Sequence, residues 1–433
     1  MITFLLVSLS ILGVVGFIRE RTIINLQSIY CILWGSISWA ASLKLYGMRN
    51  YSEDMYYIVF LGCVGFTIGY LMISLPKANK WNPIDDDKKN LYVLNKKWFN
   101  ILYYVSITFI LIFAVKVIVM LISGYPYYMI RTIFGRTGLE DSLLTNKYEI
   151  FIQVFILNAI VPVFNLLLVL HLLKINLLSK KQLIKILILG ALYVFVSGSR
   201  ITVINAMFQL FVIVVMLKVK LPRRYITKML CVVLLLMALV SIISEGRTND
   251  DAMNYVSKEQ TYYQDFTLAI PMGDYYIQMA DSKGERAYGA MFTSGIVNLL
   301  IRPLGLLGLP RPDFLEVCDK YNSMIDEFIP IYSQGTVNNA YASIFFYFYL
   351  DFGTFGVFFF SIVFGLIMKK SYVDSLKFKD LRTILIFATV LITFTKSFVR
   401  WEFVNTHYCL SFIYIYLITK KYGTKRISTS TGV

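Results

Sequence analysis

The chain has 433 residues, of which 57% are hydrophobic and only 16% are charged, and its mean hydropathy is +0.64. Soluble domains of this size do not have such a composition, so the sequence excludes an ordinary soluble protein. The net charge of +16 does not indicate nucleic acid, because 26 of the 42 Lys and Arg residues fall in six short segments between apolar runs, a pattern that marks the cytoplasmic side of a membrane.

The first part of the chain, residues 1–244, predicts eight membrane-spanning helices. Apolar runs of about 20 residues recur along it, and a run of this length crosses the roughly 30 Å hydrocarbon core as a helix. The expected spans are 1–17, 23–43, 55–75, 98–123, 151–173, two short helices within 186–217, and 229–244. We expect 1–17 to be retained with the N-terminus outside, because a positive n-region and a small-residue cleavage site are missing.

The stretch 186–217 is too long for one ordinary span. A helix of this length measures roughly 48 Å at about 1.5 Å per residue. The sequence SGSR, residues 197–200, interrupts it, so we expect two short helices with a tight external turn. A single tilted helix would put the basic segment 218–228 outside, against the distribution of positive charge.

A large external loop, residues 245–337, follows these spans. It holds 13 of the 26 acidic residues and 5 of the 10 prolines, and a smaller external loop lies near 125–148. Within the large loop, 288–309 is nearly all apolar but contains Arg302 and Pro303. Counting it as a span would move the basic segment 369–382 outside, so we predict a re-entrant or interfacial helix.

The last part of the chain, residues 338–433, predicts three more spans and a cytoplasmic tail. The spans are 338–370, 381–398 and 404–419, and Asp351, Gly353 and Gly356 are expected to break or bend the first of them. The predicted fold is therefore all-α: a polytopic membrane protein of about eleven transmembrane helices, with an external N-terminus and a cytoplasmic C-terminus.

Arginines on or near the predicted external face are the strongest candidates for ligand binding. Charge beside the bilayer is costly and tends to be functional, and the planar guanidinium suits bidentate binding of phosphate. The candidates are Arg131, Arg136, Arg200, Arg247, Arg302 and Arg400. Each also has a simpler interpretation, as a snorkelling residue, an interfacial anchor, a solvated loop charge or an ion-pair partner. We expect Arg286 and Arg311 to be solvated.

Three residues are candidates for a catalytic acid or base. Asp351 lies in an apolar run, where burial requires a partner, and the alternative is a helix cap at the break before Gly353. Glu402 lies beside Arg400, and a simple ion pair between them is the alternative. His407 lies near the external end of the last span, where a hydrogen-bonded packing histidine is the alternative.

Several kinds of site are not expected. P-loop, GxSxG and HExxH motifs are missing, which disfavours an ATP-driven pump, a serine hydrolase and a zinc protease. Two histidines make a His-based metal site improbable, and four of the five cysteines lie in apolar runs. Asp85 and Asp87 match the DxD pattern but lie in a short loop without an α/β domain. We expect no metal and no cofactor.

The arrangement resembles Wzy-type O-antigen or oligosaccharide repeat-unit polymerases. The resemblance rests on ten or more spans, one large external loop in the second half, the external arginines in YPYYMIRTIFGR, SGSR and SEGR, and the stretch NAYASIFFYFYLDFGTFG. It implies a metal-independent, lipid-linked glycosyltransferase in a bacterial inner membrane, acting on oligosaccharides linked to undecaprenyl diphosphate. Membrane lipids and a chain-length regulator protein are the further partners that it implies.

Two other functions remain open at the level of the sequence. An O-antigen ligase uses similar chemistry with a different acceptor. A lipid-linked oligosaccharide flippase or other transporter is the second alternative, although two related halves and little external mass would be expected for it. The sequence does not identify the sugar or the linkage.

Overall fold

The computed structural model describes residues 1–74, 92–125, 146–217 and 258–421, apart from residues 23, 174, 176, 177, 198–200, 326, 328, 333–336, 339 and 340. These residues form helices and two small two-stranded sheets, which confirms the predicted all-helical class. The first half contains α1 (Ile2–Glu20), α2 (Leu26–Ser42), η1 (Leu45–Gly47), α3 (Asp54–Leu71), β1 (Tyr92–Leu94), α4 (Lys96–Ile122), α6 (Lys147–Ile152), η3 (Gln153–Leu157), α7 (Asn158–Leu172), α8 (Lys180–Ser197) and α9 (Ile201–Met216).

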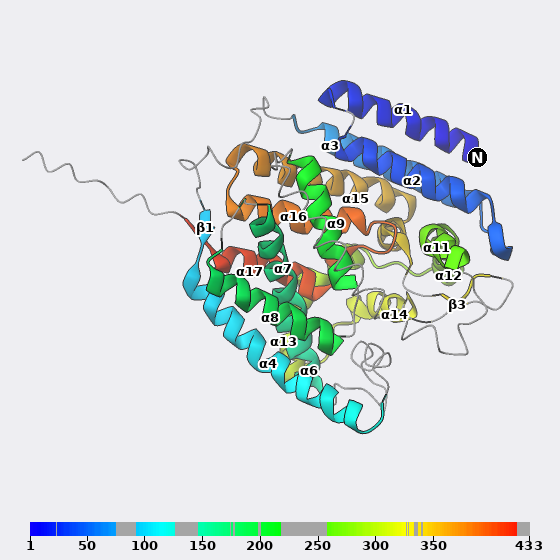
Figure 1. Ribbon diagram of the computed structural model, residues 1–433. Helices are drawn as coiled ribbons and strands as arrows, with labels where there is room; N and C mark the ends of the chain where they lie inside the picture. Colours follow the sequence, from blue (N-terminus) through cyan, green and yellow to red (C-terminus); the bar gives the residue numbers. More distant parts are fainter. Residues whose placement is uncertain are drawn as a thin grey trace, which may run out of the picture.

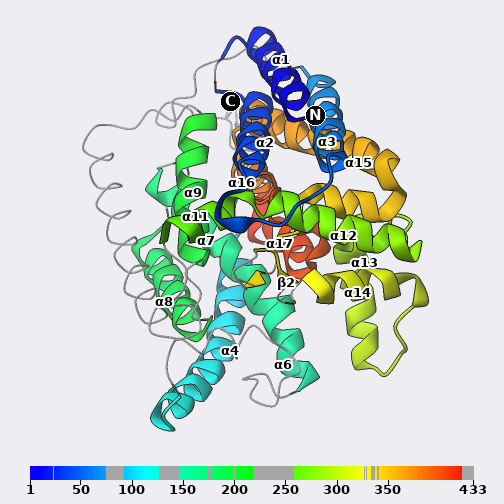
Figure 2. The same cartoon turned by 90° about the vertical axis from the view of Figure 1, so that its right-hand side faces the viewer.

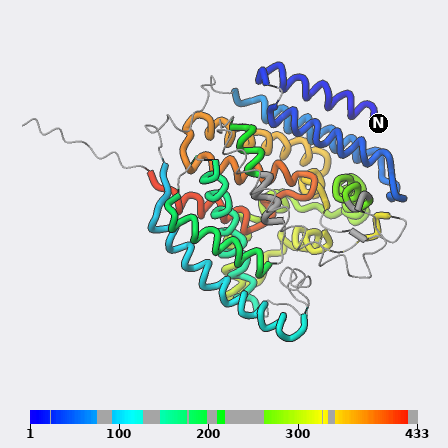
Figure 3. Tube along the Cα trace, in the orientation of Figure 1, coloured from blue at the N-terminus to red at the C-terminus, as the bar shows by residue number. Residues whose placement is uncertain are grey.

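The second half contains α11 (Lys258–Thr267), α12 (Ala269–Lys283), α13 (Ala290–Leu306), η4 (Asp313–Leu315), α14 (Glu316–Ile325), β2 (Ile329–Pro330), β3 (Val337–Asn338), α15 (Ser343–Phe378), α16 (Leu381–Thr395), η5 (Glu402–Val404), α17 (Thr406–Ile418) and β4 (Thr419–Lys421). Figure 1 shows α1, α2 and α3 side by side along one edge of the molecule, and α4 with α8 along the opposite edge. Between them lie α15, α16 and α17, and in Figure 3 the red α17 runs beside α7 and α16.

Five helices in the described part of the chain are long and apolar enough to cross a membrane. They are α1, α3, α4, the continuous helix from Lys147 to Leu172, and α15. The shorter helices α13, α16 and α17 are also apolar. These lengths and compositions are those of a helical membrane protein. The total of eleven spans stays a prediction, and the expected span 229–244 lies outside the described residues.

Two predicted interruptions of apolar runs are confirmed. The run 186–217 is divided between α8 and α9, which end and begin on either side of residues 198–200. The long helix α15 is broken at Phe352 and Gly353, whose backbone angles are not helical. At Gly353, φ is 61° and ψ is −145°, a conformation that is essentially restricted to glycine.

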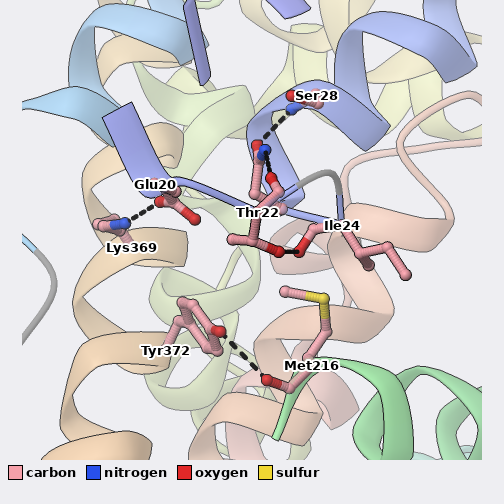
Figure 4. Close-up of polar contacts among 8 residues, drawn as sticks. Glu20, Thr22, Ile24, Ser28, Met216, Lys369 and Tyr372 are labelled. Carbon is pink, nitrogen blue, oxygen red and sulfur yellow. Dashed lines mark hydrogen bonds and ion pairs between the residues drawn. The ribbon is translucent and has the colours of Figure 1, made fainter. Parts of the chain in front are cut away.

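A buried ion pair joins α1 to α15. The sequence predicts Lys369 in a cytoplasmic segment, but in the structure this lysine is 2% exposed and pairs with Glu20, which is 4% exposed. Figure 4 shows Glu20 at the end of α1 reaching Lys369, with Tyr372 donating to the Met216 carbonyl nearby. The Lys369 ammonium also lies 4.2 Å from the centre of the Tyr70 ring. The lysine can be buried because a carboxylate and an aromatic face replace its water.

Segments far apart in the sequence meet at two ends of the helical bundle. At one end, β1 pairs antiparallel with β4, so that Val93 lies opposite Lys420. At the other end, the Arg49 amide donates to the Ile331 carbonyl at 2.8 Å, and Met48 forms an antiparallel bridge with Tyr332. The first contact joins two segments predicted to be cytoplasmic, and the second joins two predicted external loops.

The loop 245–337 contains packed helices. Figure 2 shows α12, α13 and α14 gathered on one side of the molecule, below α15. Helix α12 packs against α15, and α13 packs against α14, α15 and α17. The helices of this loop therefore share one hydrophobic core with the membrane-type helices. This packing brings α13 close to the chain before α17.

Candidate functional site

The site is built around α13, whose N-terminus is held by a carboxylate from α15. One oxygen of Asp351 accepts the backbone N–H groups of Gly289 and Met291 at 3.0 and 2.9 Å, and the other accepts that of Phe292 at 2.8 Å. These groups belong to the first turn of a helix, where backbone donors have no partner within the helix. Asp351 is fully buried. The break at Gly353 follows directly, so one irregular turn both ends the first half of α15 and caps α13.

The turn between α16 and α17 is fixed onto α13. The Trp401 indole N–H donates to the Phe292 carbonyl at 3.1 Å, and the two rings stack with centroids 5.1 Å apart. Three residues further along α13, a Cβ atom at Gly295 would lie 2.1 Å from the carbonyl oxygen of Phe403. Only glycine allows the backbones to approach this closely. The cap and this contact together set where the later residues of α13 lie.

Glu402 is a buried charge in this turn. It is 4% exposed, and its carboxylate forms an ion pair with Lys396 at 3.0 Å and accepts from the Asn405 amide at 3.2 Å. Burial alone would raise the pKa of Glu402, but the charge of Lys396, followed by that of Arg400, outweighs it, so the pKa lies below its ordinary value. The group is therefore ionised near neutral pH.

His407 lies beside this carboxylate at the start of α17. Its imidazole is half-buried and makes no hydrogen bond to any residue that the structure describes. It lies within electrostatic range of Glu402, Lys396, Arg302 and Arg400. The other histidine, His171, accepts the Leu178 amide at 3.1 Å and has a structural role. The hydrogen-bonded packing role considered for His407 is not found among the described residues.

A cavity of about 280 Å³ lies at the far end of α13. Its lining combines three cations with apolar side chains: Lys147, Arg302, Arg311, Ile150, Phe151, Phe155, Ile301, Gly305, Leu306 and Leu309. The Arg311 guanidinium is already paired with Asp319 through two nitrogens. Arg302 has no ion pair or hydrogen bond with any described residue, so its guanidinium can bind an anion.

An apolar face runs along α13 toward this cavity. Ile296, Leu300, Leu304 and Leu307 are all exposed and lie three or four residues apart, on one side of the helix. Such a row of exposed aliphatic side chains is costly in water but not against lipid. The cavity therefore joins a cationic group to a surface suited to hydrocarbon.

The structure brings together four of the residues predicted from the sequence, namely Arg302, Arg400, Glu402 and His407. Asp351 holds α13 from the other side and has the capping role considered for it, although the helix it caps is α13. The remaining candidates, Arg131, Arg136, Arg200 and Arg247, lie outside the described residues.

Three further cations were not singled out from the sequence. Lys396 lies in the apolar run 381–398. A lysine in such a run, with Glu402 six residues later, is the feature of the sequence that could have indicated an ion pair. Lys147 and Arg311 line the cavity, and Arg311 was expected to be simply solvated. Arg286, expected to be solvated as well, pairs with Asp281 at 2.6 Å.

No family model, no curated protein and no solved structure matches this chain. Within the described residues, no group of three or more His, Cys, Asp or Glu side chains has an arrangement that could hold a metal ion. The site offers three chemical groups: a guanidinium with no partner among the described residues, an imidazole, and an ionised carboxylate with its lysine.

Proposed function

We propose that the protein is a membrane glycosyltransferase that polymerises oligosaccharide repeat units carried on undecaprenyl diphosphate. The product would be O-antigen, capsule or exopolysaccharide, made on the external face of a bacterial inner membrane. One observation carries the proposal: the guanidinium of Arg302, which has no ion pair or hydrogen bond with a described residue, lies in an apolar-walled cavity within electrostatic range of the imidazole of His407. The resemblance to Wzy-type polymerases supplies the reaction.

The cavity fits an amphiphilic anion. A polyprenyl diphosphate carries negative charge at one end and a long hydrocarbon chain at the other. Arg302, Arg311 and Lys147 supply positive charge, and guanidinium groups bind phosphate oxygens in a bidentate manner. The exposed aliphatic face of α13 supplies a path for the chain within the lipid. A free sugar or a soluble nucleotide sugar would gain nothing from that face.

The reaction needs a base and a stabilised leaving group. The acceptor hydroxyl attacks the anomeric carbon, its proton passes to His407, and the bond from that carbon to the diphosphate oxygen breaks. The diphosphate leaves with an additional negative charge, which the cations of the cavity stabilise. His407 is suited to the role of base because its imidazole has no hydrogen bond to a described residue. The ionised carboxylate of Glu402 would stabilise the imidazolium, and Asp351 would position α13.

The expected two-sided topology is supported by contacts between distant segments. The β1–β4 pairing joins two segments predicted on the cytoplasmic face, and the contact between residues 48–49 and 331–332 joins two predicted on the external face. A change in the assignment of one span would place one partner of such a contact on the wrong side. The cavity lies among segments that the sequence predicts to be external, which is the side where a translocated lipid-linked substrate would be found.

The test is the length of the glycan in cells that lack the gene and carry a plasmid copy. We expect the wild type to restore a ladder, and Arg302→Ala to lower polymerising activity on the order of 100-fold, the usual effect of removing one donor to a developing anion. Arg302→Lys keeps the charge but not the planar fork and is expected to be intermediate. Lys283→Ala, at an exposed cation in the same loop, is the matched control and should give a normal ladder.

The glycan pattern also separates the alternatives. Single-repeat glycan without a ladder supports a polymerase. Loss of single repeats as well points to a flippase, or to a ligase if transfer requires the lipid A core. A normal ladder in the deletion strain, or in a well-expressed Arg302→Ala variant, contradicts the proposal.

A further inference from the structure

Two buried polar groups, one on α13 and one adjacent to His407 in the chain, have no hydrogen-bond partner among the described residues. The amide oxygen of Asn298 and the hydroxyl of Thr406 are both shielded from solvent, in residues that are 5% and 2% exposed. Native proteins leave few buried polar groups unpaired, because an unpaired group loses its hydrogen bonds to water without replacing them. These two groups therefore need a hydrogen-bond partner that is not one of the described side chains.

The way in which α13 packs on α17 brings Asn298 and Thr406 to the same interface between the two helices. At Gly295 the helices touch, since a Cβ atom there would lie 2.9 Å from the sulfur of Cys409. Further along α13, Arg302 is within electrostatic range of His407. Asn298 lies three residues after the first of these contact points and four before the second, so it is on the same face of the helix.

Asn298 therefore faces the beginning of α17. Thr406 is the first residue of that helix, and His407 follows it directly. Helix α13 packs against both α17 and the η5 turn. The two unpartnered groups thus come from two helices that pack against each other, and one of them is adjacent to His407 in the chain.

A water molecule is the partner that this position allows. The two polar atoms are almost completely shielded, so the hydroxyl of a bulky carbohydrate does not reach them. A buried water is small enough, and such waters typically make about three hydrogen bonds to otherwise unsatisfied groups. Asn298 and Thr406 supply two of them. The imidazole of His407, which has no hydrogen bond to a described residue, supplies the third.

We propose that Asn298 and Thr406 bind an ordered water that hydrogen-bonds one ring nitrogen of His407 and fixes its tautomer. Both would be positioning residues, since the tautomer decides which nitrogen is free to accept a proton. The charged groups around the ring are Glu402, Lys396, Arg302 and Arg400. The catalytic meaning of this arrangement rests on the proposed function, but the arrangement itself is measured without any activity.

The chain has only two histidines, so His407 can be observed directly. In a His171→Gln background, ¹⁵N-histidine labelling and solid-state NMR in lipid bilayers report the two ring nitrogens of His407. At about pH 8, above the ordinary imidazole pKa of about 6.5, we expect one tautomer. Thr406→Val and Asn298→Leu, which remove a polar group at similar volume, should each give a mixture of both tautomers. Thr406→Ser keeps the hydroxyl and should match the parent.

Trp401 reports whether the site is folded, because its indole N–H donates to the Phe292 carbonyl. Imidazole shifts equal to those of the parent in Thr406→Val or Asn298→Leu, with an unchanged Trp401 indole signal, overturn the proposal. So does a Thr406→Ser variant that behaves like Thr406→Val. If the Trp401 signal is lost in one of these two variants, the imidazole shifts of the other variant test the proposal. Loss of the signal in both variants overturns the proposal in favour of a purely structural role. A tautomer mixture in cells with normal glycan ladders would overturn only the proposed function.

Discussion

Two buried carboxylates near α13 show how much of a side chain's role depends on its partners. Asp351 accepts three backbone N–H groups from the start of α13 and forms no ion pair with a described residue. Glu402 is paired with Lys396 and lies beside His407. From the sequence, both are acidic residues in or next to apolar runs. The difference between a cap and a charged site residue comes from α13, which is more than 40 residues away from either in the chain.

A third carboxylate, Asp274 in α12, gives a prediction about pH. One of its oxygens accepts from the Ser52 amide at 3.1 Å and from the Gln278 side chain at 2.7 Å. Burial raises the pKa of Asp274 more than these hydrogen bonds lower it. The folded state therefore binds the proton more tightly than the unfolded state. The protonated carboxyl of Asp274 therefore stabilises the folded state. This contribution is fully present below the pKa of the unfolded state, about 3.9, and is lost as the pH rises through the pKa of the folded state.

Asp274→Asn should therefore be more stable than the wild type at neutral pH, because its amide oxygen accepts the same bonds without a buried charge. The advantage should shrink as the pH falls toward about 4, where the wild-type carboxyl is protonated as well. Thermal unfolding of the purified protein in detergent measures both effects. Asp313→Asn, at an exposed carboxylate, is the control and should show no such pH dependence. A variant less stable than the wild type at pH 7 would contradict the prediction.

At the scale of elements, the apolar runs predicted the helices closely. The expected span 55–75 is α3 (Asp54–Leu71), and 404–419 is α17 (Thr406–Ile418). The break in α15 was also predictable, because an acidic residue and two glycines interrupt an apolar run. What the runs did not predict is pairing across the chain. Glu20 and Lys369 are 349 residues apart, and only the packed bundle makes them neighbours.

The same limit applies to the candidate site. The sequence indicated Arg302, Glu402 and His407 one by one, from charge or chemistry near an apolar segment. It did not show that they share a site, because that depends on the cap by Asp351 and on the close approach at Gly295. These two contacts fix the position of α13, and no spacing along the chain encodes them.

The Glu20–Lys369 pair gives a prediction for the packing of α1. Lys369→Met leaves a buried carboxylate without its partner, which costs about 3–5 kcal/mol. The double variant Glu20→Met with Lys369→Met removes both charges and should lie within about 1 kcal/mol of the wild type, because buried ion pairs gain little over apolar packing. Unfolding by SDS in mixed micelles measures the free energy of unfolding of the wild type, Lys369→Met and the double variant.

A neighbouring ion pair provides the control for this cycle. Lys370 and Asp374 are 3.1 Å apart on the same helix, but the lysine is 70% exposed. Lys370→Met should change stability by less than about 1 kcal/mol, as exposed pairs do. If the single and double variants at Glu20 and Lys369 lose the same stability, the pair itself is not what joins α1 to α15.

At the scale of the whole molecule, the central question is whether α13 crosses the membrane. Most of its 17 residues are apolar, but it also contains Arg302 and Pro303, so composition alone permits either a span or a re-entrant helix. If α13 crosses, every later segment lies on the opposite side of the membrane from the one predicted. The strand β4 would then be external, while β1, which precedes α13, would remain on the side predicted to be cytoplasmic. Because the two strands are hydrogen-bonded to each other, the pairing favours a helix that does not cross.

Three cysteine substitutions test this directly with a membrane-impermeant maleimide on spheroplasts. Ser179 precedes α13, whereas Ser323 and Lys420 follow it, and all three are exposed. If α13 does not cross, Ser323→Cys reacts from outside, and Ser179→Cys and Lys420→Cys react only after lysis. If α13 crosses, the two sites that follow it exchange sides: Lys420→Cys reacts from outside, and Ser323→Cys reacts only after lysis. The native cysteines of the described chain are buried, and the unsubstituted protein measures their background. Reaction of Lys420→Cys in sealed spheroplasts would therefore overturn the topology, and with it the external position of the cavity at Arg302.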